Sequence, residues 1–225
     1  MQLERFRRLP LLGILRGIEA DDVEPLAAAL IDAGLDTIEI TMNTEAAPAL
    51  IRRMIDAASG RLMIGAGTVL TPEMLAAARA GGASFIVLPT LVPEVVKRCV
   101  DDGVPVFPGA LTPREIYEAW RAGATMVKVF PAGGFGPTYF KEIKGPFADI
   151  ELLACGGVSA ANMAAYFECG ASAVAFGASV FRHEWLAKKD YPRISAEVRK
   201  LVAACAAARP CPPLHLTPSN SPEQA

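Results

Sequence analysis

The stretch LLGILRGIEADDVEPLAAALIDAGLDTIEIT, residues 11–41, decides the fold class because it contains a strand, a helix and a second strand in that order. Its two ends, 11–17 and 36–41, are short runs rich in leucine and isoleucine, which is typical of parallel strands covered on both faces. Between them, residues 21–34 form an alanine-rich amphipathic segment that stops at Gly34, a residue suited to the left-handed end of a helix. The stretch therefore predicts one strand–helix unit leading into a parallel strand.

The same alternation continues to residue 177 and predicts eight strands with helices between them. The predicted strands are 11–17, 36–41, 62–67, 84–89, 104–108, 125–131, 150–157 and 171–177. Eight strand–helix units in 225 residues predict an α/β fold, a compact (β/α)8 TIM barrel in a single domain. An open doubly wound sheet is the alternative, but no G-x-G-x-x-G motif follows a strand to support it.

Several helix ends are marked in the sequence. Thr71 and Thr112 each precede a proline and are predicted N-caps, and Glu115 completes a capping box with Thr112. Glycines expected to end helices in the left-handed conformation are Gly34, Gly103, Gly123 and Gly170. These signals agree with the strand–helix alternation.

The ends of the chain set the expected domain limits. The start, MQLERFRRLPLLGILRG, is interpreted as mature protein and as the first strand, because Arg16 interrupts the apolar run that a signal peptide needs. A last helix is expected from about Tyr191 to Arg209, so that the barrel covers 1–209. Residues 210–225 are rich in proline and serine and are predicted to be a disordered tail.

Composition excludes several classes of partner. A formal net charge of −2 favours neither nucleic acid nor an anionic membrane surface, and the apolar runs are too short to span a bilayer. The five cysteines form no C-x-x-C motif and have no histidine cluster nearby, which indicates reduced intracellular thiols rather than a disulfide framework or a zinc site. We therefore expect a cytoplasmic protein without a metal site.

Lys128 is the most unusual residue of the predicted strands, because it interrupts the apolar run VKVFP, residues 127–131. If Val127 and Val129 face the helices, period-two alternation directs Lys128 into the barrel. Burying an ammonium is costly and favours the neutral amine, which can attack a carbonyl and form a Schiff base. The alternative is a lysine that pairs with an internal carboxylate or reaches solvent.

Glu39 ends the predicted strand DTIEIT and faces inward by the same alternation. The strands of Glu39 and Lys128 are the second and sixth, and alternate strands fill one interior layer of a barrel, so the two side chains are expected to share a cavity. A carboxyl group there can act as general acid and base for a Schiff-base reaction. A purely structural ion pair is the alternative.

Other polar residues lie near predicted strand ends. Arg16 ends the first strand and is expected to bind an anionic group, with a surface charge as the alternative. Thr68 follows the third strand and offers a hydroxyl beside a backbone kept open by Gly65 and Gly67. Asn43 follows the second strand and is expected either to bind substrate or to cap the next helix.

Two glycine-containing turns point to a phosphate. ACGGVSAAN, residues 154–162, closes the seventh strand, and AFGASVF, residues 175–181, closes the eighth. Backbone N–H groups at such turns bind phosphate, and these two loops are the usual place for it in a barrel. The predicted phosphate-binding residues are Gly156, Gly157, Gly177 and Ser179. Tight packing of the turns is the alternative.

Six motifs, in order, resemble one known family: ILRGI, EITMNT, GAGTVLTPE, FPGALTP, KVFPAGGFGP and GGVSAAN. They are similar to the bacterial class I aldolases of 2-keto-3-deoxy-6-phosphosugar acids, which include the 6-phosphogluconate, 6-phosphogalactonate and 4-hydroxy-2-oxoglutarate enzymes. The resemblance covers residues 8 to 182. It implies a homotrimer of barrels, without cofactor, that cleaves a phosphorylated keto acid into pyruvate and glyceraldehyde 3-phosphate.

The resemblance also implies residue roles. Lys128 would be the Schiff-base lysine and Glu39 the general acid and base, as the residues themselves predict. Arg16 and Thr68 would hold the pyruvate end of the substrate, and the two glycine turns its phosphate. The remaining residues expected to contact substrate are Asn43, Pro89, Phe130 and Cys155.

Two positions bear on which sugar acid is cleaved. The gluconate enzymes typically have arginine where this chain has Asn43, whereas the galactonate enzymes have asparagine, which favours galactonate. Cys155 matches neither the threonine of the gluconate enzymes nor the valine of the galactonate enzymes. Because a small thiol packs more like valine than like a hydroxyl, Cys155 favours galactonate as well, while relaxed selectivity remains open.

The resulting hypothesis is a cofactor-free class I aldolase. Two rival hypotheses are an isomerase or lyase on phosphosugars that uses Glu39 alone for proton transfer, and a non-catalytic barrel that binds a phosphorylated metabolite. The isomerase would form no covalent adduct, and the binding protein would be stabilised by ligand without turnover. Neither rival explains the six motifs.

Overall fold

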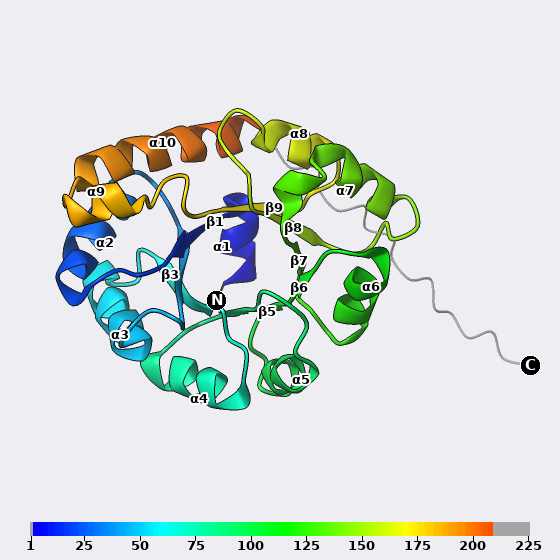
Figure 1. Ribbon diagram of the computed structural model, residues 1–225, viewed down its shortest axis with the longest axis horizontal. Helices are drawn as coiled ribbons and strands as arrows, with labels where there is room; N and C mark the ends of the chain where they lie inside the picture. The colour runs from blue at the N-terminus through cyan, green and yellow to red at the C-terminus, as the bar shows by residue number, and fades with distance from the viewer. Residues whose placement is uncertain (1, 209–225) are drawn as a thin grey trace, which may run out of the picture.

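The computed structural model describes residues 2–208 and shows a barrel of parallel strands surrounded by helices (Figure 1). The predicted tail, residues 210–225, lies outside the described residues. The strands are β1 (Leu11–Leu15), β2 (Thr37–Thr41), β3 (Met63–Gly67), β4 (Ile86–Val87), β5 (Val106–Phe107), β6 (Gly109–Ala110), β7 (Val127–Val129), β8 (Leu152–Cys155) and β9 (Ala173–Phe176). All pairs are parallel, in the order β5-β4-β3-β2-β1-β9-β8-β7-β6. The predicted (β/α)8 TIM barrel is confirmed.

The fifth predicted strand is split in two by Pro108. Proline lacks a backbone N–H and so interrupts a strand ladder. The first half, β5, pairs with β4, and the second half, β6, pairs with β7. The Pro108 carbonyl accepts a hydrogen bond from the backbone N–H of Lys128 at 2.9 Å. The barrel therefore closes through this broken strand, and the eight predicted strands are observed as nine segments among residues 2–208.

The helices connect the strands on the outside of the barrel. They are α1 (Leu3–Arg8), α2 (Val23–Asp32), α3 (Ala47–Ala58), α4 (Pro72–Gly81), α5 (Pro93–Asp101), α6 (Pro113–Arg121), α7 (Pro137–Lys144), α8 (Met163–Glu168), α9 (His183–Ala187) and α10 (Tyr191–Ala208), with short 3-10 helices at Ala20–Asp22 and Ala132–Gly134. Thr71 caps α4 and Thr112 forms a capping box with Glu115, as predicted. All four predicted C-terminal glycines have positive φ. No helix within 2–208 is long and apolar enough to cross a membrane.

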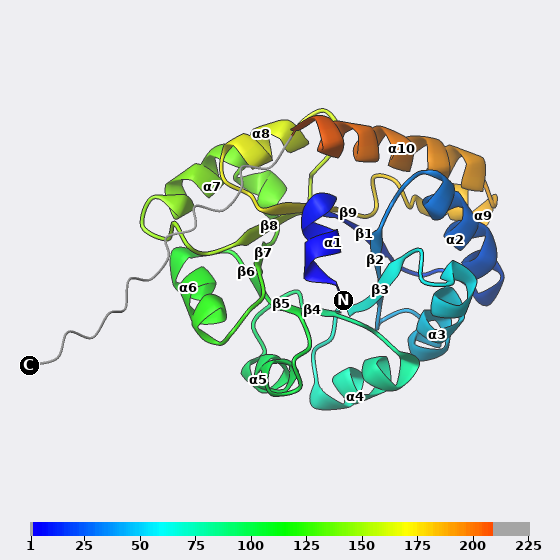
Figure 2. The ribbon, with the colours of Figure 1, turned by 180° about the vertical axis from the view of Figure 1, so that it is seen from behind.

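Helix α1 corrects the interpretation of the first residues as part of the first strand. Both face-on views place α1 over the centre of the ring of strands (Figure 1, Figure 2). Its Phe6 is fully buried and meets Phe107 edge to face, with ring centroids 6.0 Å apart. The helix therefore covers one opening of the barrel, at the end where the strands begin. Helix α9 was also not predicted.

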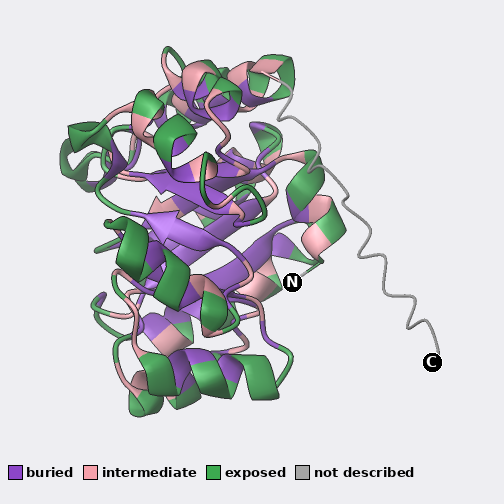
Figure 3. Ribbon diagram, turned by 90° about the vertical axis from the view of Figure 1, so that its right-hand side faces the viewer, coloured by how far each residue is buried: buried purple, intermediate pink, exposed green. Residues whose placement is uncertain are grey.

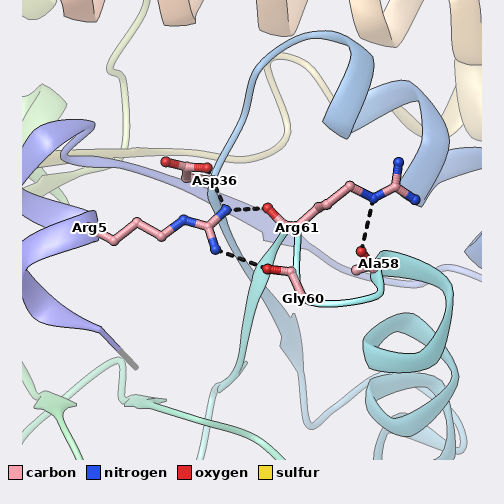
Figure 4. A network of polar contacts seen from close by, with 5 residues as sticks. All are labelled: Arg5, Asp36, Ala58, Gly60 and Arg61. Carbon is pink, nitrogen blue, oxygen red and sulfur yellow. Dashed lines mark hydrogen bonds and ion pairs between the residues drawn. The ribbon is translucent and has the colours of Figure 1, made fainter.

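Arg5 anchors α1 to the barrel (Figure 4). Its guanidinium donates to Asp36 Oδ1 at 2.7 Å, to the Gly60 carbonyl at 3.0 Å and to the Arg61 carbonyl. Arg61 itself donates to the Ala58 carbonyl at 3.2 Å, which fixes the same turn. One side chain thus joins α1 to the start of β2 and to the loop before β3.

The buried residues form two layers, as the side view shows (Figure 3). Val127 and Val129 pack between strands and helices, whereas Met126 belongs to the cluster inside the barrel. Gly65 admits the Phe85 ring into that interior, because a Cβ at residue 65 would lie 2.4 Å from a ring carbon. Apolar side chains thus fill much of the interior, and the polar residues lie further along the strands.

Candidate active site

Lys128 lies on β7 and points into the barrel on the same face as Met126. It pairs with Gly109 of β6 and Leu153 of β8, and the residue is 7% exposed. Its Nζ is 5.4 Å from the centroid of the Phe130 ring. Within residues 2–208, Lys128 forms no ion pair with a carboxylate. The structural alternative, a lysine held in a direct ion pair, is therefore not what these coordinates contain.

Glu39 lies on β2 between Ile14 of β1 and Gly65 of β3, and it is 1% exposed. Its Oε2 is buried and has no hydrogen-bond partner among the described residues. Burial raises the pKa of Glu39, and the positive charges of Lys128 and Arg16 oppose that rise. A buried carboxyl with a free oxygen and a raised pKa is suited to exchanging a proton near neutral pH.

Gly67, the last residue of β3, makes room for that carboxyl group. A Cβ built on Gly67 would lie 2.1 Å from Glu39 Oε1 and 2.6 Å from Cδ. Our sequence analysis assigned Gly67 only to the open backbone beside Thr68. Thr68 follows with a φ of 56°, in the left-handed region, and is partly exposed. The glycine therefore has a second purpose, which depends on its neighbour across the sheet.

Arg16 directly follows β1 and is exposed. Its side chain makes no hydrogen bond or ion pair within the part of the chain that the structure describes. Its charge lowers the pKa of both Glu39 and Cys155, which fits a guanidinium near the mouth of the barrel interior. Exposure and an unused set of donors leave Arg16 available to an anionic group.

Asn43 is exposed after β2 and does not cap the next helix. The N-cap of α3 is Ala46, with no side-chain cap, so the capping alternative for Asn43 is wrong. Thr44 is the buried polar residue of this loop, and its hydroxyl binds the backbone N–H of Gly17. The sequence gave no sign of that contact, because it joins residues of different loops.

Cys155, Phe130 and Pro89 surround Lys128 at three strand ends. Cys155 ends β8 and is buried; burial raises the pKa of its thiol, and the Lys128 charge opposes that rise. Phe130 is 41% exposed beyond the end of β7. Pro89 follows β4, and its carbonyl lies so close to β6 that a Cβ at Gly109 would approach it to 2.1 Å. All three predicted contact residues therefore end strands at the same opening.

The glycine pair after β8 forms a turn that requires glycine. Gly156 and Gly157 have φ values of 91° and 78°, which other residues rarely adopt. Asn162, which we had not predicted, fixes this turn: its Nδ2 donates to the Gly157 carbonyl at 2.9 Å, and its Oδ1 accepts from the Ser159 backbone N–H at 2.8 Å. The pattern of a glycine pair followed by an Asn before a helix was the available signal.

The turn after β9 lies next to it, because Cys155 of β8 pairs with Ala175 of β9. The Gly177 carbonyl accepts hydrogen bonds from the N–H groups of Val180 and Phe181, both at 2.9 Å. Ser179 is exposed, and its carbonyl accepts from Arg182 Nε at 3.2 Å. The two predicted anion-binding turns are thus neighbours.

The candidate residues lie on consecutive strands of the barrel. The order β2-β1-β9-β8-β7 carries Glu39, the Arg16 loop, the two glycine turns and Lys128 in sequence. An amine, a carboxyl, a guanidinium and free backbone N–H groups are therefore brought to one opening. No group of three or more His, Cys, Asp or Glu residues within 2–208 is arranged to hold a metal ion.

Comparison with known proteins agrees with this site. A family model described as KDPG and KHG aldolase matches residues 3–197. The chain is 39% identical over 176 residues to the 2-dehydro-3-deoxy-6-phosphogalactonate aldolase of Escherichia coli (strain K12), covering 78% of this chain and 86% of that protein. A solved structure described as native KDPGal superposes with a TM-score of 0.83 at 36% identity, over 89% of this chain and 96% of that one.

A second solved structure is the KDPG aldolase of Legionella pneumophila with pyruvate captured as a covalent carbinolamine intermediate. It has a TM-score of 0.79 at 26% identity and covers 90% of this chain and 95% of that one. The chain belongs to the KDPG and KHG aldolase family. It is thus an aldolase, an enzyme of the carbon–carbon lyase class.

Proposed function

We propose that this protein is a class I aldolase that cleaves 2-dehydro-3-deoxy-6-phosphogalactonate to pyruvate and D-glyceraldehyde 3-phosphate. The observation that carries the proposal is a buried lysine, Lys128, without an ion-pair partner, inside a barrel that also holds the partnerless carboxyl of Glu39. The similarity to the galactonate enzyme of Escherichia coli supports the choice of substrate.

In the proposed reaction, the neutral amine of Lys128 attacks the keto carbon of the substrate to give a carbinolamine, and loss of water gives an iminium. The iminium withdraws electrons while Glu39, directly or through a water, removes the proton of the C4 hydroxyl. The C3–C4 bond breaks, glyceraldehyde 3-phosphate leaves, and an enamine remains on Lys128. Protonation at C3 and hydrolysis release pyruvate and the free amine.

The other candidate residues bind the substrate. Arg16 and Thr68 hold the carboxylate end, and the N–H groups of the two glycine turns hold the phosphate. The binding residues of the turns are Gly156, Gly157, Gly177 and Ser179. Asn43, Pro89, Phe130 and Cys155 line the carbon chain between these ends. The supporting observations are the unpaired Arg16 side chain and the adjacency of the turns on β8 and β9.

The same-family alternatives are cleavage of the 6-phosphogluconate isomer or of 4-hydroxy-2-oxoglutarate. Asn43 and the small thiol of Cys155 favour galactonate. A thiol in place of a hydroxyl or a methyl changes binding by only about 1–3 kcal/mol, so activity on both C4 isomers is expected with galactonate preferred.

We further propose a cytoplasmic homotrimer that works without a cofactor, with residues 1–209 as its functional domain. The four described cysteines are free thiols, which supports a reducing compartment. The trimer is supported by the resemblance of the six motifs to the family.

Borohydride reduction in the presence of pyruvate tests the proposal. Intact mass and peptide mapping should find a pyruvyl adduct on Lys128, and parallel assays should show faster cleavage of the galactonate than of the gluconate substrate. Turnover of a phosphosugar without any adduct would favour the isomerase hypothesis. Thermal stabilisation by phosphorylated sugar acids, with neither adduct nor turnover, would favour the binding protein.

A further inference from the structure

Two buried threonines join the C-terminal ends of β1 and β2. Thr41 ends β2 and is fully buried, and Thr44 is 6% exposed in the loop that follows. Their hydroxyl oxygens are 3.1 Å apart. The Thr44 hydroxyl also accepts a hydrogen bond from the backbone N–H of Gly17 at 3.0 Å. The Thr44 side chain therefore connects the loop after β1 to the loop after β2.

The residue next to Gly17 is Arg16, which has no anchor of its own. The ladder between β1 and β2 ends at the pair Leu15 and Ile40, so Arg16 is the first residue beyond it. The chain then turns at Gly17, whose φ of 64° lies in the left-handed region. Among residues 2–208, Arg16 makes no side-chain hydrogen bond or ion pair. The hydrogen bond from Gly17 to Thr44 is thus the nearest constraint on where Arg16 points.

The sheet register places this link beside the site. Ile14 pairs with Glu39, and Arg16 and Thr41 each follow two residues later on their strands. Period-two alternation puts Arg16 and Thr41 on the face of the sheet that carries Glu39. A hydroxyl that holds Gly17 at this edge therefore also sets the position from which the Arg16 side chain reaches the barrel opening.

We infer that Thr44 is a positioning residue for the keto-acid carboxylate: its buried hydroxyl fixes Gly17 and thereby aims the Arg16 guanidinium. The inference rests on the proposed aldolase function and deepens it, because Thr44 acts on substrate binding through Arg16 without touching the substrate. Loss of the hydroxyl would leave the Gly17 N–H and the Thr41 hydroxyl without their partner and release the loop.

The test compares Thr44→Val, which keeps the shape and removes the oxygen, with Thr44→Ser, which keeps the oxygen. The valine variant should weaken pyruvate binding, measured by calorimetry, and raise KM by about three- to tenfold, the size of one hydrogen bond, with kcat within about twofold of wild type. The serine variant should resemble wild type. Hydrogen exchange at the Gly17 amide should accelerate in the valine variant alone.

A double-mutant cycle with Arg16→Ala separates positioning from general damage. If Thr44 acts through Arg16, Thr44→Val should not weaken pyruvate binding further in the Arg16→Ala background. An equal loss in both backgrounds, or a serine variant as weak as valine, would overturn the inference. Thr44→Ala replaces the valine variant if valine does not fold.

The binding measurement also separates this inference from the proposed function. A wild-type protein that binds pyruvate but cleaves no sugar acid would refute the aldolase proposal and leave Thr44 to be decided by the binding cycle. A wild-type protein that binds no pyruvate would overturn both.

Discussion

Gly67 of β3 and Glu39 of β2 occupy the same space in the barrel, so that only one of them can carry a side chain there. A Cβ on Gly67 would come within 2.1 Å of Glu39 Oε1, a separation that no relaxed structure contains. The position of the proposed general acid and base is thus set by the absence of a side chain on the neighbouring strand.

Gly67→Ala should therefore impair catalysis more than binding. The added methyl group must displace the Glu39 carboxyl, and displacement of a reacting group by about 1 Å reduces the rate by about 100-fold. We expect that loss in kcat, with KM nearly unchanged and the pyruvyl adduct on Lys128 retained. Steady-state kinetics and borohydride trapping measure these effects.

Gly145→Ala is the matched control, because a Cβ there would meet only the Glu142 carbonyl, at 3.3 Å. It should keep wild-type kinetics. A normal kcat in the Gly67→Ala variant would show that Glu39 is not positioned as described.

Glu39→Gln should lose most turnover and keep the fold, because the amide fits the same space but cannot exchange the proton. General acid–base residues contribute typically about 100- to 10,000-fold, and a loss of kcat in that range is expected. Circular dichroism checks the fold. Near-normal turnover would remove Glu39 from the mechanism.

The same variant should change how stability depends on pH. Burial raises the pKa of Glu39 above its ordinary 4.5. The stability contributed by the protonated carboxyl is therefore fully present below about pH 4.5 and is lost as the pH rises through the raised value. Glutamine does not titrate, so Glu39→Gln should gain thermal stability relative to wild type as the pH increases from about 4 to about 8. A difference in Tm that is constant with pH would contradict the raised pKa.

Lys128→Met should abolish the pyruvyl adduct while preserving the fold, since the barrel interior accepts an apolar side chain of similar length. Lys144→Met provides the control: Lys144 is partly buried and donates to the carbonyls of Ala148 and Ile150, at 2.9 and 2.7 Å. That control should lower Tm but retain the adduct. An adduct that persists in Lys128→Met would place the Schiff base elsewhere.

Asn162→Asp should weaken binding of the phosphate end. Aspartate keeps the oxygen that accepts from Ser159 but cannot donate to the Gly157 carbonyl, and its charge repels a phosphate. KM for the phosphorylated sugar acid should rise about tenfold or more, whereas pyruvate trapping should be unaffected. Equal effects on pyruvate and on the phosphorylated substrate would argue against a phosphate site at this turn.

The sequence by itself determined the barrel and the inward direction of its unusual residues. Alternation between short apolar strands and amphipathic helices is local, and so is the period-two rule that directs Lys128 and Glu39 to the interior. Helix caps such as Thr112 with Glu115 depend on residues three positions apart and were equally readable. The N-terminal helix α1 escaped prediction because it is short, and its stability comes from Phe6 and Arg5 contacts with distant residues.

Only the tertiary structure decided which residues support those two side chains. The contacts of Gly67 with Glu39, of Thr44 with Gly17 and of Arg5 with Asp36 each join different secondary-structure elements or loops. Their existence depends on the register between strands and on how the barrel closes, including the interruption of the fifth strand at Pro108. A sequence pattern fixes which face a residue occupies, whereas its neighbour on the next strand is fixed only when backbone hydrogen bonds align the two chains.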